Sequence, residues 1–468
     1  MARWTDEMGL RLGILVMAAG KGTRMRSGLP KVLHPILDAP MLGYLLRSVL
    51  GCGADEVAVL VGSGGEQVEE YLRSFPDVKT LWQREQLGTG HAVKVTRDWW
   101  ERFDSLLVLN GDLPLLRPET LNDLLNRCRK DPADGTLLTF DACNPDGYGR
   151  VVRSPGGVRI VEHKDASDEE RLVREVNAGC YFFATASLAR VIDRIGNDNA
   201  QGEYYLPDVI SLMTGEGMRV RALPMPEEEM MGVNTQAELA GVTRILRDRI
   251  ALGWMERGVR IMDPSAVWIG PDVELSPGVR VMPNVQIWGR TRVGEDCFIG
   301  PGCILTDAVL GRDVVLIANV VLENSELCDA AKAGPFAYIR EGSRLESRAF
   351  AGKFVELKKT TVGRNSKVPH LSYLGDARLG EDVNIGAGTI TCNYDGKSKH
   401  PTTIGDRCFV GSDTMFVAPA TMGDDASTAA GSVITEPVPE GALGVGRARQ
   451  RNVEGWTSRR KKLERQGG

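Results

Sequence analysis

Paired cysteines, histidine and long apolar runs are all scarce in this chain of 468 residues. The nine cysteines include no CxxC pair and their number is odd, so they predict neither structural zinc nor a disulfide framework and favour a reduced protein. No window approaches 18 uncharged apolar residues, and residues 1–13 lack the apolar segment of a leader peptide. We therefore expect a cytoplasmic protein with no membrane partner.

A strong charge of one sign is also missing. The formal net charge is −5, with 25% charged and 42% hydrophobic residues, as in an ordinary globular protein. The tail after Arg447 is basic but lacks the interleaved aromatic residues of a nucleic-acid-binding segment, so we predict no nucleic-acid partner. At this length the chain should divide into two or three domains.

A six-residue period is the most regular feature of the sequence. Leu, Ile or Val occupies seven successive sixth positions: Ile269, Leu275, Val281, Ile287, Val293, Ile299 and Leu305. Because these residue types make up about a fifth of a typical chain, such a run has odds on the order of one in 10⁵ per starting point. A hexapeptide period predicts short strands that coil into a parallel β-helix, with one aliphatic side chain of each face pointing inward.

The period is interrupted near 306–309, at 327–332, at Thr361, at Arg378 and across 393–403. Regular coils form a scaffold, so we expect the chemistry where the period breaks. The segment 391–401 is too long for one coil and predicts a projecting loop that lines a binding site, a purely structural loop being the alternative.

Residues 1–236 read as an α/β domain. Buried strands are predicted at Leu12–Met17, Val57–Val61, Ser105–Leu109 and Thr136–Phe140, and helices at Pro40–Leu50, Gly88–Asp98 and Pro118–Arg129. A capping-box pattern at 235–238 then opens an apolar helical period that ends near Gly258. We accordingly predict a first domain at 1–236, a helical linker at 237–257 and a β-helix domain with its basic tail at 258–468.

Two turns of the first domain carry candidate chemistry. Gly20-Lys21-Gly22 follows a strand directly, where α/β proteins expose backbone N–H groups to phosphate, although a plain tight turn fits as well. The segment matches neither GxGxxG nor the Walker A pattern. Asp112 ends another strand, where a carboxylate suits Mg²⁺ bound to substrate phosphates, the alternative being a turn aspartate bonded to backbone amides.

The motifs of this half resemble those of the sugar-1-phosphate nucleotidylyltransferases. They run in order from AAGKGTRM at 18–25 and LPK at 29–31 through QLGTGHA at 86–92, NGD at 110–112, GYGR at 147–150, EHKD at 162–165 and GVN at 232–234. The resemblance is to the first half of the bifunctional N-acetylglucosamine-1-phosphate uridylyltransferase/glucosamine-1-phosphate acetyltransferase family. It implies that Arg24 and Lys31 act on the phosphates and that Asp112 and Asn234 bind Mg²⁺. It also implies nucleotide and UDP-sugar contacts at Met17, Ala18, Ala19, Gly20, Lys31, Gln83, Gly88, Thr89, Asn110, Gly111, Asp112, Gly149, Glu162, Asn177 and Asn234. Among these, Gln83, Gly88 and Thr89 would contact uracil, and Gly149, Glu162 and Asn177 the amino sugar.

The irregular part of the repeat contains His370, one of only five histidines. A histidine at neutral pH can accept the proton of an amine that attacks a thioester, although an isolated histidine is more often a surface residue. Arg340 and Lys358 are eighteen residues apart, one coil of three hexads, and would therefore stack and hold a phosphate.

The second half resembles the acetyltransferase half of the same family. The resemblance implies that His370 is the proton acceptor, that Arg340, Lys358, Tyr373 and Asn384 bind glucosamine 1-phosphate, and that acetyl-CoA contacts Ala387, Asn393, Tyr394, Ser412, Ala430 and Arg447. It further implies that the β-helix is left-handed and the protein a homotrimer. The implied product is UDP-N-acetylglucosamine, made from glucosamine 1-phosphate, acetyl-CoA and UTP for cell-wall and lipopolysaccharide synthesis.

Two other readings remain at this point. One is a nucleotidylyltransferase for another hexose 1-phosphate whose β-helix only regulates or assembles the enzyme, and His370, Arg340 and Lys358 argue against it. The other is a non-catalytic scaffold with a degenerate first domain, which the intact Lys31 and Asp112 argue against.

Overall fold

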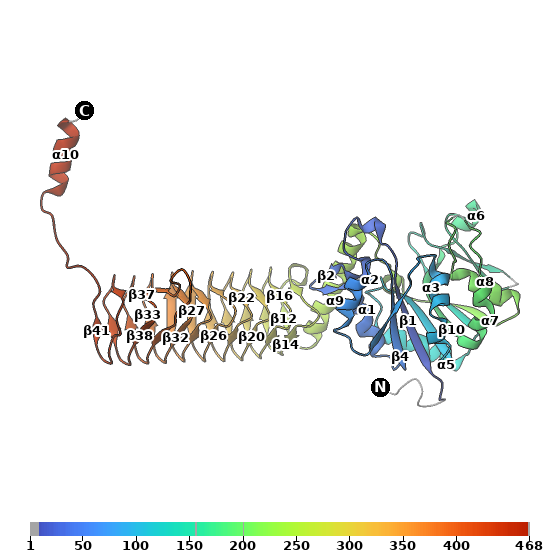
Figure 1. Ribbon diagram of the computed structural model, residues 1–468, viewed down its shortest axis with the longest axis horizontal. Coiled ribbons are helices and arrows are strands. Elements are labelled where there is room, and N and C mark those ends of the chain that lie inside the picture. The colour runs from blue at the N-terminus through green and yellow to red at the C-terminus, as the bar shows by residue number, and fades with distance from the viewer. Residues whose placement is uncertain (1–8, 155–156, 200, 467–468) are drawn as a thin grey trace. The chain divides into compact units, whose positions relative to one another are not determined.

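The computed structural model describes residues 9–154, 157–199 and 201–466. The chain divides into two units, Met1–Leu246 and Arg247–Gly468 (Figure 1). None of the described helices is both long and apolar enough to span a membrane.

The first unit is built on a nine-stranded, mostly parallel sheet in the order β11-β7-β10-β6-β1-β4-β5, with β8 joining β10 to β9. Only β10 runs antiparallel to its neighbours β6 and β7, and β8 and β9 form an antiparallel pair. The strands are β1 Leu12–Ala18, β4 Glu56–Val61, β5 Val78–Trp82, β6 Ser105–Asn110, β7 Gly135–Asp141, β8 Arg150–Ser154, β9 Gly157–Val161, β10 Glu175–Ala184 and β11 Val220–Pro224, and a small hairpin pairs β2 Pro35–Ile36 with β3 Ala39–Pro40.

Helices cover both faces of this sheet, which explains why its strands read as continuous apolar runs. Ile14 and Val16 point into one core with helices α1 and α5, whereas Leu15 points into the other with α7 and α8. The helices are α1 Met41–Leu50, α2 Gly65–Leu72, α3 Thr89–Val95, α4 Arg97–Trp100, α5 Pro118–Lys130, α6 Asp168–Arg171, α7 Thr185–Val191 and α8 Pro207–Gly215, with short 3₁₀ turns at Thr23–Met25, Lys31–Leu33, Ile192–Arg194 and Glu227–Met230.

The four predicted strands of this unit are confirmed as β1, β4, β6 and β7, and the predicted helices at 40–50 and 118–129 as α1 and α5. The predicted helix Gly88–Asp98 is wrong as a single element, because Thr96 separates α3 from α4. The buried hydroxyl of Thr96 donates to the carbonyl oxygens of Val93 at 3.0 Å and Ala92 at 3.2 Å, which lets a side chain compete with the backbone for helical acceptors.

The predicted linker helix is α9, Gln236–Glu256. Its capping box is present: the Glu238 N–H donates to Thr235 Oγ1 at 3.2 Å and the Thr235 N–H donates to a Glu238 carboxylate oxygen at 3.1 Å. Leu246 and other apolar residues of its first half are buried in a core of the first unit, and Ala251 is buried in the core of the second.

The second unit is a left-handed parallel β-helix with three sheets. The first sheet holds β12 Arg260–Ile261, β15 Arg280–Val281, β18 Phe298–Ile299, β21 Val315–Leu316, β24 Lys332–Ala333, β27 Phe350–Lys353, β30 Lys367–His370, β33 Asn384–Ile385, β36 Phe409–Val410, β39 Ser427–Thr428 and β41 Leu443–Gly444. The second holds β13 Trp268–Ile269, β16 Gln286–Trp288, β19 Ile304–Thr306, β22 Val321–Glu323, β25 Tyr338–Ile339, β28 Glu356–Lys358, β31 Tyr373–Gly375, β34 Ile390–Cys392, β37 Met415–Val417 and β40 Val433–Ile434. The third holds β14 Glu274–Leu275, β17 Arg292–Val293, β20 Val309–Leu310, β23 Glu326–Leu327, β26 Arg344–Leu345, β29 Thr361–Val362, β32 Ala377–Leu379, β35 Thr402–Ile404 and β38 Ala420–Met422, and the tail forms helix α10, Trp456–Gln466.

The hexad positions all point into one core, as predicted. Each buried Leu, Ile or Val contributes roughly 1.5–3 kcal/mol, and stacking makes that core continuous from coil to coil. The single-residue slips share one cause: at four coils the step from the second sheet to the third takes five residues, as from Leu305 to Leu310. The slip expected at 327–332 is wrong, because the short step lies earlier, between Leu322 and Leu327, and Leu327 to Ala333 is again six.

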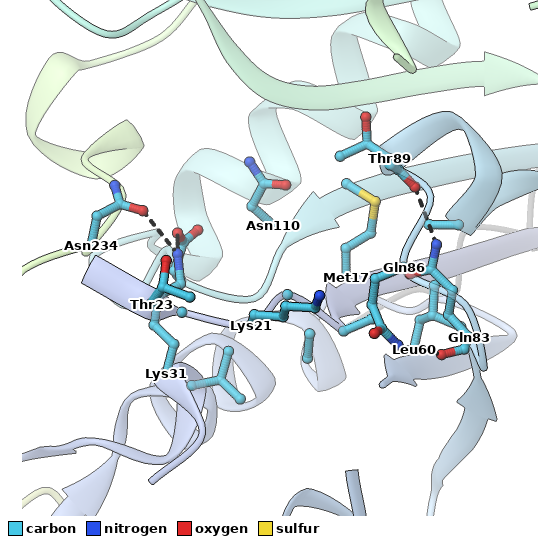
Figure 2. Close-up of a pocket in the computed structure, with 18 of the residues that line it drawn as sticks. Met17, Lys21, Thr23, Lys31, Leu60, Gln83, Gln86, Thr89, Asn110 and Asn234 are labelled. Carbon is cyan, nitrogen blue, oxygen red and sulfur yellow. Dashed lines mark hydrogen bonds and ion pairs between the residues drawn. The ribbon is translucent and has the colours of Figure 1, made fainter. Parts of the chain in front are cut away.

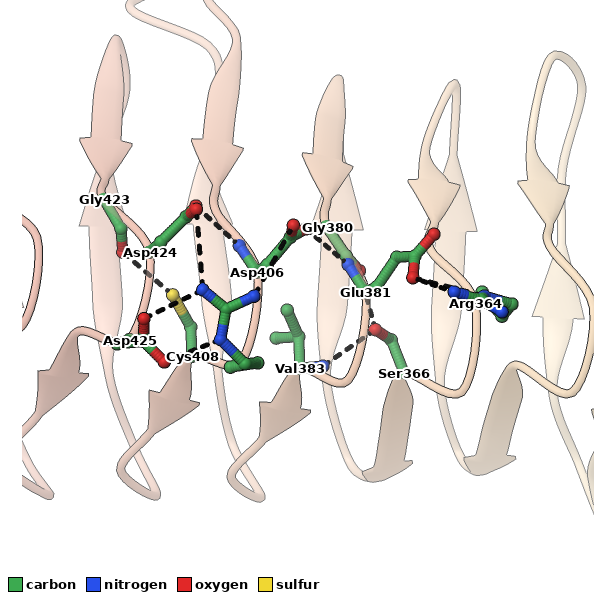
Figure 3. Close-up of polar contacts among 11 residues, drawn as sticks. Arg364, Ser366, Gly380, Glu381, Val383, Asp406, Cys408, Gly423, Asp424 and Asp425 are labelled. Carbon is green, nitrogen blue, oxygen red and sulfur yellow. Dashed lines mark hydrogen bonds and ion pairs between the residues drawn. The ribbon is translucent and has the colours of Figure 1, made fainter.

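Polar contacts tie the coils together at the corner between the third and first sheets (Figure 3). Asp406 accepts the Glu381 N–H at 2.8 Å, and Asp424 accepts the Asp406 N–H at 2.9 Å, so each carboxylate caps the coil before it. Arg407 pairs with Asp425 through two hydrogen bonds of 2.8 Å. These contacts satisfy the backbone groups of corners that lack strand partners, which makes this stretch a rigid support.

Two candidate active sites

The first candidate site is a cavity of about 520 Å³ at the carboxyl ends of β1, β4, β5 and β6. Strand β1 lies between β4 and β6, so the order of the sheet reverses there, which is where open α/β sheets bind ligands. Of the residues predicted to bind nucleotide or UDP-sugar, those that line it are Met17, Ala18, Ala19, Gly20, Arg24, Lys31, Gln83, Gly88, Thr89, Asn110, Asp112 and Asn234. Gly111, Gly149, Glu162 and Asn177 do not line this cavity.

Positive charge collects at one end of the cavity. Lys31 forms an ion pair with Asp112, and its Nζ also donates to Asn234 Oδ1 at 3.0 Å. Arg24 Nη2 donates to the same Asn234 oxygen at 2.8 Å. Figure 2 shows Lys31 meeting Asn234 on one side of the cavity, with Gln83 and Thr89 on the other. The arrangement places two cations against the side-chain oxygens of Asp112 and Asn234 at this end of the cavity.

The glycine-rich turn leaves its backbone donors unused. Within the described part of the chain, the N–H groups of Gly20, Lys21 and Gly22 form no hydrogen bond. Gly22 has φ +58°, and a Cβ there would lie 2.8 Å from Lys31 Cβ, so only glycine allows the turn to pack on Lys31. Free N–H groups beside Lys31 form a cradle for an anion.

The residues predicted for Mg²⁺ fit a cation. Asp112 Oδ1 is buried and has no hydrogen-bond partner among the described residues, and the Lys31 ammonium lies against both Asp112 and Asn234. No group of three or more His, Cys, Asp or Glu with metal-binding geometry occurs within residues 9–154, 157–199 and 201–466. A site with one carboxylate and one amide suits Mg²⁺, which takes its remaining ligands from water and substrate phosphates.

Gly149, Glu162 and Asn177 lie together, although outside the cavity lining. The Asn177 N–H donates to the Gly149 carbonyl at 2.8 Å, and a Cβ on Gly149 would lie 3.1 Å from Glu162 Oε1. Burial raises the pKa of Glu162, and the neighbouring carboxylates Asp165 and Asp208 raise it further. Asn177 Nδ2 donates to the Tyr181 hydroxyl at 2.6 Å and its Oδ1 accepts the Gly179 N–H at 3.0 Å, so Glu162 is the member of this group whose side chain forms no hydrogen bond with the described residues.

The second candidate site lies on the second sheet of the β-helix. Register places Arg340 beside Lys358 on successive coils, as predicted from their spacing. Both contact carboxylates: Arg340 Nη1 donates to Glu356 at 2.8 Å, and Lys358 Nζ lies 3.5 Å from Glu341. The Tyr373 hydroxyl leans along its strand toward this edge, where it would lie 2.5 Å from a Cβ on Gly375.

The segment 393–400 projects as a small hairpin from the corner after β34, confirming the predicted projection. Asn393 Nδ2 donates to Asp376 at 2.5 Å and the His400 N–H donates to the Asn393 carbonyl at 2.8 Å. The hairpin brings Lys399 to Lys358, and the nearby Lys358 ammonium lowers the pKa of Lys399. Lys399 thus adds a further positive charge near Arg340 and Lys358.

His370 is the last residue of β30 in the first sheet, and it lies at the corner that leads into the second sheet. Its exposed ring forms no hydrogen bond within the described ranges, and its register partner on the preceding coil is Lys353. Asn384 begins β33, the strand that pairs with β30. Ala387, Ser412, Ala430 and Arg447 follow along this corner, each one coil further; the Asp413 N–H donates to Ala387, the Gly431 N–H to Ser412, and Arg447 Nη1 to Ala430.

We predicted that Asn393 and Tyr394 contact acetyl-CoA together with Ala387 and Arg447. They lie at the opposite edge of the second sheet from the row of Ala387, Ser412, Ala430 and Arg447. A strand of three residues separates the two edges by about 10 Å. One chain therefore does not bring these residues together.

The sequence did not single out four residues that contact the predicted site residues: Lys399 and Glu341 beside Lys358, Asp376 beside Asn393, and His91, whose Nδ1 lies 3.0 Å from Gln83 Nε2. Lys399 had a detectable signal, because it lies in the longest interruption of the period. Glu341 and Asp376 had none, since acidic residues at coil corners are common throughout the repeat.

With this geometry in place, comparisons with known proteins define the class. A MobA-like NTP transferase domain matches residues 14–197, and the hexapeptide repeat of succinyl-transferase matches residues 290–324 and 401–436. The protein thus joins a nucleotidyltransferase domain to a hexapeptide-repeat transferase domain.

Full-length relatives give the family. The bifunctional protein GlmU of Fervidobacterium nodosum is 47% identical over 451 residues, covering 96% of this chain and 97% of its own length. That of Clostridium perfringens is 44% identical over 449 residues, covering 96% and 98%, and that of Thermus thermophilus is 47% identical over 448 residues, covering 95% and 98%. This chain belongs to the family of bifunctional GlmU proteins.

Proposed function

We propose that this enzyme makes UDP-N-acetylglucosamine in two reactions. The β-helix domain transfers the acetyl group of acetyl-CoA to glucosamine 1-phosphate, and the first domain transfers uridylyl from UTP to N-acetylglucosamine 1-phosphate with release of pyrophosphate. The observation that carries the proposal is the match along nearly the whole chain to bifunctional relatives, with a separate candidate site in each unit. Because UTP and acetyl-CoA are cytoplasmic metabolites, we assign both reactions to the cytoplasm.

In the first domain the sugar phosphate oxygen attacks the α-phosphorus of UTP while pyrophosphate leaves. Two polyanions must meet, so the protein mainly positions them and neutralises their charge. Arg24, Lys31 and the free N–H groups of the glycine-rich turn serve this purpose. Asp112 and Asn234 would hold Mg²⁺, which supplies further positive charge to the phosphates when bound.

In the β-helix domain the amine of glucosamine 1-phosphate attacks the thioester carbonyl of acetyl-CoA. His370 accepts the proton that the amine loses, the carbon–sulfur bond of the thioester breaks as the amide bond forms, and His370 returns the proton so that CoA leaves as the thiol. The ring of His370 has no hydrogen-bond partner among the described residues and is available for this proton. Arg340, Lys358 and Lys399 hold the substrate phosphate, displacing Glu341 from Lys358.

We further propose a homotrimer. The outward side chains of the second sheet include an apolar row of Trp268, Ile304, Val321, Ile390, Met415 and Val433, and those of the first include Phe298, Phe350 and Phe409, whereas the third sheet presents mainly charged and hydroxyl residues such as Glu274, Arg292 and Arg378. A three-sided prism can offer the apolar row of its second sheet to one neighbour and the phenylalanines of its first sheet, which lie among charged residues, to the other, and such head-to-tail contacts close as a ring. Packing between copies would also bring Asn393 and Tyr394 of one copy to the row of Ala387 and Arg447 on another.

The deciding experiment supplies glucosamine 1-phosphate, acetyl-CoA, UTP and Mg²⁺ to the purified enzyme and detects UDP-N-acetylglucosamine by mass. Omission of acetyl-CoA should abolish this product, and N-acetylglucosamine 1-phosphate should restore it. Product from a hexose 1-phosphate alone, with no release of CoA thiol, would instead support the regulatory β-helix reading.

A further inference from the structure

The side-chain amide of Gln83 is held by two acceptors from the first turn of α3. Gln83 follows β5 and is only 4% exposed. Its Nε2 donates to the Gly88 carbonyl at 3.2 Å and lies 3.0 Å from His91 Nδ1. Both hydrogens of the amide nitrogen therefore have an acceptor, and neither is free to bind a ligand.

The Gly88 carbonyl determines on which side the nitrogen and the oxygen of the Gln83 amide lie. A carbonyl only accepts, so the nitrogen end must face it. This carbonyl is itself fixed, because it accepts the Ala92 N–H at 3.1 Å, and a Cβ on Gly88 (φ +107°) would come within 2.6 Å of the Tyr204 carbonyl oxygen. It follows that His91 Nδ1 accepts the second N–H and that the imidazole proton is on Nε2.

The oxygen end of the amide is left for the ligand. Gln83 Oε1 accepts no hydrogen bond within the described residues, and Gln83 lines the cavity next to Met17 and Leu60, which provide apolar surface for a flat ring. An acceptor in this position complements a ring N–H.

We infer that His91 is a positioning residue that helps to select uracil over cytosine by holding the Gln83 amide in this orientation; this rests on the proposed uridylyl transfer. Uracil N3 carries a hydrogen and donates, whereas cytosine N3 accepts. A Gln83 oxygen directed at N3 thus pairs with uracil and opposes cytosine. The two ends of an amide have nearly the same shape, so rotation by half a turn would reverse this preference.

His91 raises the cost of that rotation. With His91 present, both N–H groups of the amide are satisfied by α3, and rotation breaks both bonds. With an apolar residue in its place, one N–H is unpaired, and only the Gly88 bond opposes the orientation that favours cytosine. Loss of one neutral hydrogen bond typically changes such a balance about three- to tenfold.

Two variants of similar shape test this role. Asn places an amide oxygen near the position of His91 Nδ1, and Leu places a methyl group there. We expect His91→Leu to lower the UTP-to-CTP ratio of kcat/KM about three- to tenfold, mainly through KM, and His91→Asn to stay within about twofold of the wild type. An unchanged ratio in a folded His91→Leu variant overturns the inference, since a residue with a merely structural role would lower activity with both nucleotides equally.

The imidazole itself provides a test that does not depend on His91→Leu folding. ¹⁵N NMR of the wild-type enzyme, with the His91 signals assigned by their loss in His91→Asn, reports which ring nitrogen carries the proton. A proton on Nε2 at neutral pH supports the inference, and a proton on Nδ1 contradicts it. A wild-type enzyme that releases no pyrophosphate from UTP would contradict the proposed function instead, and the NMR result would still report on the hydrogen bond.

Discussion

Lys31 pairs with one oxygen of the Asp112 carboxylate and leaves the other, Oδ1, buried without a hydrogen-bond partner among the described residues. A buried, unpaired carboxylate oxygen costs free energy unless a ligand satisfies it. The same Lys31 ammonium contacts Asn234, so a cation already lies against both residues proposed to hold Mg²⁺.

Removal of this carboxylate should separate the two activities. We expect Asp112→Asn, which keeps the shape but loses the charge, and Asp112→Ala to lower uridylyl transfer by at least about 10²-fold. Acetyl transfer should stay within about twofold, because its proposed residues belong to the other unit. Pyrophosphate release and CoA thiol release measure the two reactions in one preparation. Near-normal pyrophosphate release in Asp112→Asn would remove Asp112 from the metal site.

Substitution of His370 should have the opposite effect. A general base typically contributes 10²–10⁴-fold, so His370→Ala should lose acetyl transfer by about that factor while uridylyl transfer is retained. His400→Ala is the matched control, since His400 pairs with Asp395 at 2.7 Å and has no proposed catalytic role. Equal losses in the two variants would show that His370 is not the base.

Lys399 should act on substrate binding. A charge-assisted hydrogen bond to phosphate is worth about 1.5–3 kcal/mol, so we expect Lys399→Gln to raise KM for glucosamine 1-phosphate by about tenfold or more, with KM for acetyl-CoA unchanged. Lys397→Gln alters the same hairpin at an exposed residue whose side chain forms no hydrogen bond or ion pair with the described residues, and it should leave both constants unchanged. The idea fails if the two variants behave alike in steady-state kinetics.

The repeat and its core could be predicted because periodicity depends only on residue type and spacing. Leu305 and Leu310 had to point inward whatever their neighbours, and the strand positions of the first unit followed from apolar runs such as 12–17. The contact between Lys399 and Lys358 could not be predicted, because it depends on how a hairpin folds back over an earlier coil.

The orientation of the Gln83 amide could not be predicted from the sequence either. Its partners His91 and Gly88 are close in sequence, yet their roles follow from a turn and a helix start whose geometry no spacing rule describes. The break of the predicted helix at Thr96 has a local cause. The pattern of apolar residues continues through Thr96, but its buried hydroxyl donates hydrogen bonds to two backbone carbonyl oxygens of α3.

The proposed assembly can be tested on a single coil. Met415 lies outward on the apolar second sheet, and Thr421 lies outward on the polar third sheet of the same coil. Burial of an unpaired carboxylate costs several kcal/mol, so Met415→Glu should weaken association by at least about 10²-fold and lower the mass measured by analytical ultracentrifugation. Thr421→Glu should leave the mass unchanged. Identical masses for both variants and the wild type would show that the second sheet does not form the interface.

The last prediction concerns pH. Burial, with Asp165 and Asp208, holds the pKa of Glu162 above its ordinary value of 4.5. The folded state thus binds this proton more tightly than the unfolded state, and the stability it contributes is present below about pH 4.5 and is lost as the pH rises through the folded pKa. Glu162→Gln should therefore raise the Tm at neutral pH, and the gain should shrink as the pH falls toward 4.5.

Glu170 provides the control of opposite sign. The Ser167 N–H and Arg159 lower the pKa of Glu170, so its contribution to stability is present above its ordinary range and lost in acid. Glu170→Gln should lower the Tm at neutral pH, with a difference that disappears in acid. Thermal unfolding of both variants between pH 4 and 8 measures how far each Tm differs from that of the wild type. A Glu162→Gln difference that stays the same at every pH would show that the buried, ionised Glu162 does not destabilise the fold.

Because Glu162 is also proposed to contact the amino sugar, the stabilised variant should bind N-acetylglucosamine 1-phosphate more weakly, with KM raised about tenfold.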